Sequence, residues 1–134
     1  MNTNRKVGNG FEKELCRVLA SYGFWCHNMA QNSQGQPFDV IAARGGMCHP
    51  IDCKDCAKNI FKLERIEENQ SLAMRLWRAT GNGKSWFALR LNTGEVYMIS
   101  SPSMEASMVE KSVLSEREIR TLGIPLGKWV KLCK

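Results

Sequence analysis

Charged residues interrupt two short apolar segments of this sequence, and their placement constrains the fold more than any other feature. Asp39 lies in the segment 38–43, and Asp52 and Lys54 lie in the segment 49–54. Both segments have the length and composition of strands, and a Gly-Gly pair separates them, so they are predicted to pair as a hairpin. Because side chains alternate across a strand, Asp52 and Lys54 are predicted to share one face.

Apolar periodicity and turn residues predict the remaining elements. Helices are expected over 7–22 and 63–77, and strands over 24–29, 86–91 and 96–100, with polar loops at 30–37 and 80–84. Beyond residue 100, Ser115 and Glu118 form a capping box that predicts a short helix ending at Gly123. The segment 129–132 predicts a final edge strand. The order α-β-β-β-α-β-β, followed by a small α/β tail, predicts an α/β fold.

Length and composition indicate one folded domain. A chain of 134 residues with 43% hydrophobic and 24% charged residues is long enough for a single core. Trp25, Trp77 and Trp86 are expected in that core, and Trp129 in the core or in a dimer contact. No apolar run approaches the roughly 20 residues that cross a bilayer, and the first residues lack the apolar part of a secretory signal. We therefore expect a soluble cytoplasmic protein with no membrane partner.

The acidic residues Glu12, Asp39 and Asp52 predict a metal site. A hairpin could bring the two aspartates together, where their charges repel unless a divalent cation or a proton neutralises them. Carboxylate oxygens suit Mg²⁺ or Mn²⁺ better than zinc. Lys54 could position a water and offset charge on a phosphate, which suits metal-dependent hydrolysis of a phosphodiester. Each residue alone is more often a turn, chance or solvated residue, and the ordered combination carries the prediction.

The charge of the chain favours a polyanionic partner. The formal net charge is +6, from 19 basic and 13 acidic residues, and nucleic acid is the commonest polyanion. The residues predicted to face DNA are Arg5, Lys6, Lys54, Lys58, Lys62 and Arg65. For each of them, the alternative is a place on a solvated basic rim.

The six cysteines are expected to be reduced, because nothing places the chain in an oxidising compartment. Four possible ligands within nine positions leave zinc open as an alternative: Cys48, His49, Cys53 and Cys56. No second CxxC and no spaced pair of histidines completes a usual zinc finger. Cysteines packed in the core are therefore the favoured interpretation.

The order of these motifs resembles the PD-(D/E)xK nuclease superfamily, and within it the Holliday-junction resolvases of archaeal and RecU type. The resemblance covers residues 5–100, about three-quarters of the chain. It rests on a basic pair and a glycine before Glu12, and on a loop with serine and glycine that leads into Pro37-Phe38-Asp39. It rests further on Ile51-Asp52-Cys53-Lys54 and on the segment 61–70, which ends in Gln70.

This resemblance implies a restriction-endonuclease-like fold, with a central mixed β-sheet flanked by helices, in a single nuclease domain with its core over about 5–100 and a tail over 101–134. It implies that Asp39, Asp52 and the backbone carbonyl of Cys53 hold Mg²⁺, for which Mn²⁺ substitutes, and that Glu12 completes the site directly or through water. Lys54 and Gln70 would act in catalysis, and Ser33 would contact DNA.

The substrate implied is the four-way junction of branched double-stranded DNA, cut by a homodimer in a bacterial, archaeal or phage-infected cell. Two departures from the resolvases concern Asp52, where glutamate is more usual, and the loop 30–37, which is shorter than the stalk of RecU-type enzymes. Two alternatives stay open. One is another endonuclease of the same superfamily, in restriction or phage DNA processing, and the other is a catalytically inert module that binds branched DNA.

Overall fold

The strand β3 (Met47–Cys56) is the longest of the fold and lies at the centre of its main sheet. In the computed structural model, residues 3–29 and 37–133 are described, with side chains described from residue 10. The other elements are α1 (Thr3–Ser21), β1 (Trp25–Asn28), β2 (Val40–Arg44), β4 (Phe61–Lys62), the 3₁₀ turn η1 (Leu63–Arg65), α2 (Glu68–Ala79), β5 (Trp86–Leu91), β6 (Val96–Ser100), α3 (Ser101–Glu110), β7 (Val113–Leu114), α4 (Glu116–Leu122), β8 (Ile124–Pro125) and α5 (Leu126–Leu132).

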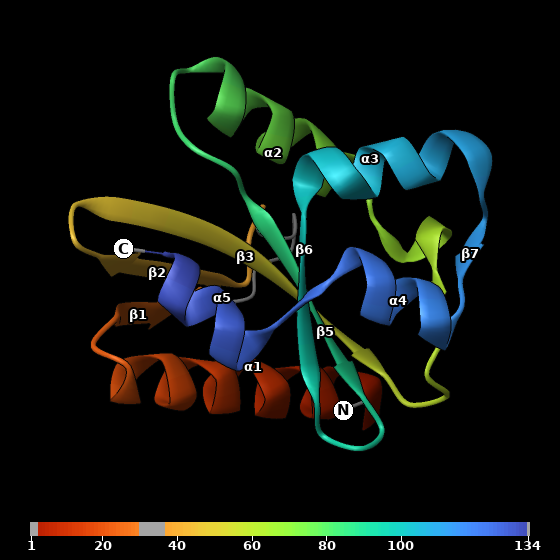
Figure 1. Ribbon diagram of the computed structural model, residues 1–134, viewed down its shortest axis with the longest axis horizontal. Coiled ribbons are helices and arrows are strands. Elements are labelled where there is room, and N and C mark those ends of the chain that lie inside the picture. The colour runs from red at the N-terminus through yellow and green to blue at the C-terminus, as the bar shows by residue number, and fades with distance from the viewer. Residues whose placement is uncertain (1–2, 30–36, 134) are drawn as a thin grey trace.

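Six strands form the main sheet in the order β1-β2-β3-β5-β6-β8. β3 and β5 run parallel, and every other neighbouring pair is antiparallel. Helix α1 lies along one face of this sheet, and α2 and α3 lie over the other (Figure 1). The predicted fold class, a mixed sheet flanked by helices, is therefore confirmed.

Two separate hydrophobic clusters hold the helices on the sheet. Phe11, Leu15 and Leu19 of α1 pack with Trp129 of α5 on one face. On the other face, Met74 of α2 packs in a cluster that also contains Met104 of α3 and Ile119 of α4. The central strands β2, β3, β5 and β6 therefore present apolar residues to both clusters, and a charged side chain inside such a strand is forced into a buried position.

The hairpin between β2 and β3 follows directly from its two glycines. Gly45 has φ 62° and Gly46 has φ 81°, and a two-residue turn with both φ angles positive matches the twist of the flanking strands. The register pairs Arg44 with Met47 and ends at Val40 with Ile51. The second predicted hairpin also forms, with β5 and β6 over the predicted residues 86–91 and 96–100.

The C-terminal region differs from the sequence-based expectation. The predicted edge strand over 129–132 is wrong, because this segment belongs to helix α5, while β8 forms the edge strand. A four-residue apolar run does not distinguish strand from helix by periodicity. The helix α3 was not predicted. Its N-cap residue is Ser100, whose hydroxyl accepts a hydrogen bond from the Ser103 amide. The predicted capping box of α4 is present.

The tryptophans differ sharply in burial. Trp129 is fully buried and stacks on Phe24 with ring centroids 5.8 Å apart, so it is a core residue. Trp77 and Trp86 pack against the clusters from half-buried positions. The expectation of a buried Trp25 is wrong, because this side chain is 63% exposed on the outward-facing side of β1.

No helix within residues 3–29 and 37–133 has both the length and the apolar content needed to span a bilayer.

Replacing Trp129 by alanine should lower the free energy of unfolding by about 3–5 kcal/mol, because it leaves a cavity among Phe24, His49 and Trp86. Trp25→Ala is the matched control, and it should change the free energy of unfolding by about 0.5 kcal/mol or less. Urea unfolding followed by far-UV circular dichroism measures both. Equal losses for the two variants would contradict this assignment of the core.

Candidate active site

Asp39 lies at the point where β2 separates from β3. Its amide donates to the carbonyl of Ile51 at 3.0 Å, which is the last backbone contact between the two strands. Two residues further along β3, the Cys53 amide donates to the Oδ2 atom of Asp39 at 2.7 Å. A side-chain carboxylate thus replaces the missing strand, and it is held against the open edge of β3.

Asp52 and Lys54 point to the face of β3 that α2 covers, as their alternation predicts. The Asp52 side chain is fully buried, and its Oδ2 atom lies 3.4 Å from the Nζ atom of Lys54. Gln70 of α2 completes the group. Its Nε2 atom donates to Oδ1 of Asp52 at 3.1 Å, and its Oε1 atom accepts from Nζ of Lys54 at 3.4 Å.

The position of Gln70 follows from the local structure at the start of α2. Glu67 is the N-cap residue, and Gln70 is the third residue of the helix, so the two form a capping box. The Oε1 atom of Gln70 also accepts from the Glu67 amide at 3.2 Å. Because the helix start fixes this side chain, its amide reaches Asp52 in a defined orientation.

Glu12 approaches the same edge from α1, on the opposite face of the sheet. Its side chain is only 5% exposed. Burial, the neighbouring charge of Asp39 and a hydrogen bond with Asp39 raise the pKa of Glu12 from 4.5 to about 7, while the charge of Lys54 opposes this rise. Among the described residues, none donates a hydrogen bond to its Oε2 atom.

Burial also raises the pKa of Asp52 well above its ordinary value, and the Lys54 ammonium group opposes this effect while Asp39 adds to it. Three carboxyl groups thus meet at the open edge of β3 with one ammonium group to balance them. A divalent cation would relieve this repulsion, so the donor set fits one. Within residues 3–29 and 37–133, no group of three His, Cys, Asp or Glu side chains is placed to hold a metal ion, but Mg²⁺ needs only one or two carboxylates because it retains several waters.

The structure therefore brings together Glu12, Asp39, Asp52, Lys54, Gln70 and the backbone of Cys53. The first and last of these, Glu12 and Gln70, are 58 positions apart in the sequence. Ser33 lies outside the described residues, and so do the side chains of Arg5 and Lys6, which lie in α1.

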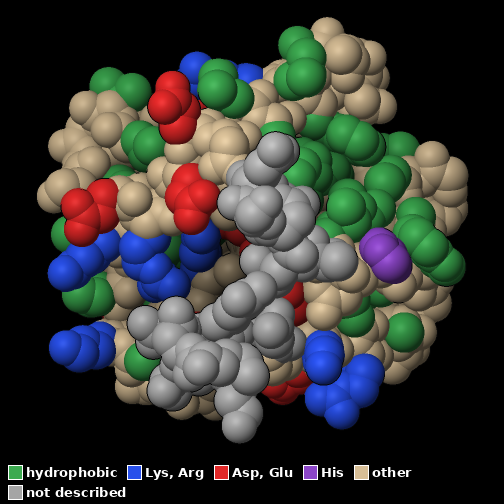
Figure 2. Space-filling model, turned by 180° about the vertical axis from the view of Figure 1, so that it is seen from behind, with side chains coloured by type: hydrophobic (Ala, Val, Ile, Leu, Met, Phe, Trp, Pro, Cys, Tyr) green, Lys and Arg blue, Asp and Glu red, His purple; other side chains and the backbone are tan. Residues whose placement is uncertain are grey.

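Lys58, Lys62 and Arg65 are exposed in the segment after β3. The Arg65 guanidinium donates to the carbonyl of Asp55 at 3.0 Å and lies over the ring of Phe61. In Figure 2, Lys and Arg side chains gather in one group at the left of the face and in another at the lower right, and hydrophobic side chains are most frequent at the upper right.

The cysteines that left zinc open do not form one site. Cys56 is buried in the cluster beneath α2, whereas Cys53 packs on the opposite face of the sheet against the cluster of α1. His49 is also buried on the α1 side, where its ring packs edge-on against the rings of Phe24 and Trp129. The CxxC spacing in a strand separates its two thiols onto opposite faces, and all six cysteines are free.

Sequence analysis did not identify the neighbours of the site on the α1 side. Arg90 of β5 lies beside Asp55 in the register of β3 and β5, and it also contacts Glu14 of α1. The one hint of this pair in the sequence was Asp55, the second aspartate of the segment Asp52-Cys53-Lys54-Asp55. Its partner could not be identified from the sequence, because Arg90 lies 35 positions away.

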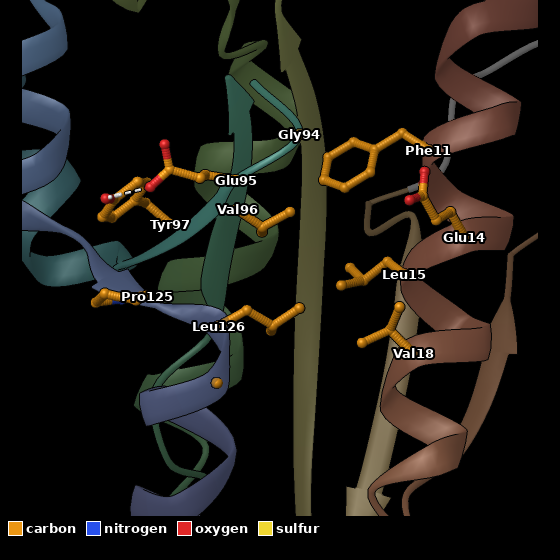
Figure 3. A pocket seen from close by; sticks show the side chains of 11 residues that line it. Phe11, Glu14, Leu15, Val18, Gly94, Glu95, Val96, Tyr97, Pro125 and Leu126 are labelled. Carbon is orange, nitrogen blue, oxygen red and sulfur yellow. Dashed lines mark hydrogen bonds between the residues drawn. The ribbon is translucent and has the colours of Figure 1, made fainter. Parts of the chain in front are cut away.

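A groove of about 300 Å³ lies elsewhere, between α1, β6 and the start of α5. Phe11, Leu15 and Val18 face Val96 and Leu126 across it (Figure 3). None of the carboxylates Glu12, Asp39 and Asp52 lines this groove, so the chemistry of the acidic residues is not located there.

Comparison with known proteins identifies the family and the fold. The family model described as archaeal Holliday junction resolvase (Hjc) matches residues 3–134. Among solved structures, the Hjc of Archaeoglobus fulgidus, a Holliday junction resolvase from an archaeal hyperthermophile, is similar with a TM-score of 0.69 and 18% sequence identity, over 92% of this chain and 95% of that chain. At this identity the likeness shows the fold. A search of curated protein sequences finds no match.

The raised pKa of Glu12 predicts a pH-dependent stability. Between pH 4.5 and about 7, the folded protein keeps a proton on Glu12 that the unfolded chain has released. In the absence of divalent metal, the free energy of unfolding should therefore fall as pH rises over this range. A shift from 4.5 to about 7 corresponds to roughly 3 kcal/mol. Glu12→Gln should therefore be more stable than wild type at pH 8, and nearly equal to it at pH 4.5.

Urea unfolding in chelator at several pH values measures this difference. Glu110→Gln, at an exposed position, serves as the matched control and should follow wild type at every pH. If the curves of wild type and Glu12→Gln stay parallel from pH 4.5 to 8, Glu12 is not held protonated by its surroundings.

Proposed function

The chain belongs to the archaeal Holliday junction resolvase family, and from this premise we propose that Asp39, Asp52 and the backbone carbonyl of Cys53 hold the divalent cation with which it cuts branched DNA. Membership makes the protein a metal-dependent endonuclease that acts on four-way junctions. The site proposal rests above all on the Asp39 carboxylate held against β3 by the Cys53 amide, beside the buried Asp52.

The proposed ion is Mg²⁺, with Mn²⁺ as a substitute. All of the proposed ligands are oxygen atoms, which hard cations prefer. The amide and carbonyl of one residue point to the same edge of a strand, and the Cys53 amide points to Asp39. Its carbonyl therefore lies on the edge where the carboxylates meet. Glu12, which approaches from α1, would complete the site through a water molecule.

Each side chain around the cation has a separate task in this proposal. A bound divalent cation supplies charge neutralisation at the phosphate and activation of water for hydrolysis. Gln70 orients Asp52 through its Nε2 atom and holds Lys54 through its Oε1 atom. Lys54, with a side chain only 13% exposed, would donate to a phosphate oxygen or to the attacking water. Glu12, with its pKa near 7, can accept or release a proton close to neutral pH.

The DNA would lie over the basic side chains next to this site. Lys58, Lys62 and Arg65 are exposed in the segment that continues from β3, and Arg5 and Lys6 belong to the helix that carries Glu12. Together with Ser33, they are the proposed contacts to phosphate. Contacts of this kind give affinity that falls steeply with salt, and they do not read sequence. The whole chain would act as one nuclease domain.

We further propose that the protein works as a homodimer, because a twofold enzyme can cut two opposed strands of a junction. The surface that supports this is the outer face of α2, where Leu72 is 53% and Leu76 is 64% exposed. They are four residues apart and therefore neighbours on the helix surface. Exposed apolar side chains in such a group are typical of protein interfaces.

Asp39→Asn and Asp52→Asn should each lower the rate of junction cleavage by more than the roughly 10- to 100-fold loss that is typical of residues that only support a metal ligand. Both should bind the junction as tightly as wild type or more tightly, because a negative charge near the phosphate is removed. The measurement is cleavage of a labelled four-way junction and of a linear duplex of the same sequence, with Mg²⁺ and with chelator.

Glu110→Gln should cleave like wild type. Normal cleavage by either aspartate variant would refute the proposed site. Equal metal-dependent cleavage of junction and duplex would leave a nuclease without junction selectivity, and binding without cleavage by wild type would identify an inert binding module.

The double variant Leu72→Asp/Leu76→Asp should be monomeric, because it places charge in the proposed apolar interface. Light scattering coupled to gel filtration measures the mass directly. Leu132→Asp is the matched control, since this leucine is 60% exposed on α5, and it should stay dimeric. A monomeric wild type, or a dimeric double variant, would rule out this interface.

A further inference from the structure

The side of β3 that faces α1 carries a network of charged groups next to the proposed metal site. Asp55 follows Lys54 by one residue, and its carboxylate accepts two hydrogen bonds from Arg90. The Nε atom of Arg90 lies 3.1 Å from Oδ1, and the Nη2 atom lies 2.8 Å from Oδ2. This is the bidentate geometry in which an arginine fixes the plane of a carboxylate.

The same guanidinium reaches across to α1. Its Nη1 atom donates to Oε2 of Glu14 at 2.6 Å, and its Cζ atom lies 4.6 Å from the centre of the Phe11 ring. Phe11 and Glu14 stand on either side of Glu12 in the sequence. The side chains of Arg90 and Asp55 are 20% and 23% exposed, so this pair is partly shielded from solvent, whereas Glu14 is 52% exposed.

We infer that Arg90, through Asp55 and Glu14, is a positioning residue that sets the place of Glu12 relative to Asp39 and Asp52. This inference rests on the proposed function of these carboxylates as the metal site. Arg90 itself would touch neither the cation nor the scissile phosphate.

The physical reason is that Glu12 and Asp52 belong to different layers. Glu12 lies on α1, whereas Asp52 faces α2 on the other side of the sheet. Gln70 holds Asp52 and Lys54 from the α2 side. On the α1 side, the guanidinium group of Arg90 on β5 donates hydrogen bonds to Asp55 of β3 and to Glu14 of α1. It therefore joins both strands to the helical turn that carries Glu12. The apolar cluster holds α1 on the sheet, and the hydrogen bonds of Arg90 add a polar link between β3 and the turn that carries Glu12.

The chain offers a close control for this arginine. Arg120 of α4 donates to both carboxylate oxygens of Glu95 at 3.0 Å and to Glu116 at 3.0 Å, and it lies 5.4 Å from the ring centre of Tyr97. It thus joins a helix to a strand through the same chemistry as Arg90. Its partners belong to none of the groups of the proposed site.

The test compares Arg90→Met with Arg120→Met, which remove the same charge. Arg90→Met should raise the Mg²⁺ concentration for half-maximal single-turnover cleavage about tenfold, and lower the rate at saturating Mg²⁺ about tenfold or more. It should also weaken Mn²⁺ binding to the DNA-free protein, followed by electron paramagnetic resonance. Arg120→Met should stay within twofold of wild type in each measurement. Junction affinity in chelator should be equal for the two variants.

Two results would overturn the inference. Equal shifts for Arg90→Met and Arg120→Met would make Arg90 a merely structural residue. Weaker junction binding by Arg90→Met with an unchanged Mg²⁺ midpoint would make it a DNA contact. Failure of the proposed function is distinct from both, because normal cleavage by Asp52→Asn would reveal it whatever Arg90 does.

Two further variants keep the test decisive if Arg90→Met does not fold. Glu14→Gln removes only the arm to α1, and it should raise the Mg²⁺ midpoint several-fold. Arg90→Lys keeps the charge but cannot hold both carboxylates, so it should also raise the Mg²⁺ midpoint several-fold. If Arg90→Met folds, adding Glu14→Gln to it should cause little further loss, since both act on one interaction. Wild-type Mg²⁺ midpoints for Glu14→Gln and Arg90→Lys would overturn the inference.

Discussion

The hydrogen bond from the Cys53 amide to the Asp39 carboxylate is the contact on which the arrangement of the candidate site depends. β2 leaves β3 after the pair Val40 and Ile51, and a backbone donor at that edge needs an acceptor. Asp39 supplies the acceptor with its side chain. The edge stays open beyond it, so a carbonyl and two carboxylates share a space that a continuous strand would have filled.

The helices on the two faces of the sheet supply the rest of the site from opposite sides. α2 brings Gln70 to Asp52 and Lys54 through its capping box, and α1 brings Glu12 to Asp39. Burying three carboxyl groups around one ammonium group lowers the stability of the metal-free protein, which the raised pKa of Glu12 expresses. In the function proposed for this family member, metal-dependent cleavage needs these carboxylates, and that need would offset their cost in stability.

Local pattern was sufficient for much of the fold. The hairpin of β5 and β6 and the capping box of α4 appear where turn and cap residues predicted them. The pattern was insufficient where burial decides between alternatives. The run around Trp129 is a helix because α5 packs this ring against Phe24, and Trp25 is exposed because β1 is an edge strand that turns it outward. Both outcomes depend on neighbours distant in the sequence.

For the candidate site, the sequence by itself determined which groups are available and which share a strand face. The alternation of β3 puts Asp52 with Lys54, and the two glycines at 45 and 46 bring Asp39 beside them. Only the tertiary structure decided how far each group is buried, which sets the pKa of Glu12, and that Arg90 contacts Glu14 across 76 positions of sequence. The reason is physical: side-chain periodicity is a property of the local backbone, whereas burial and charge pairing arise when separate elements pack together.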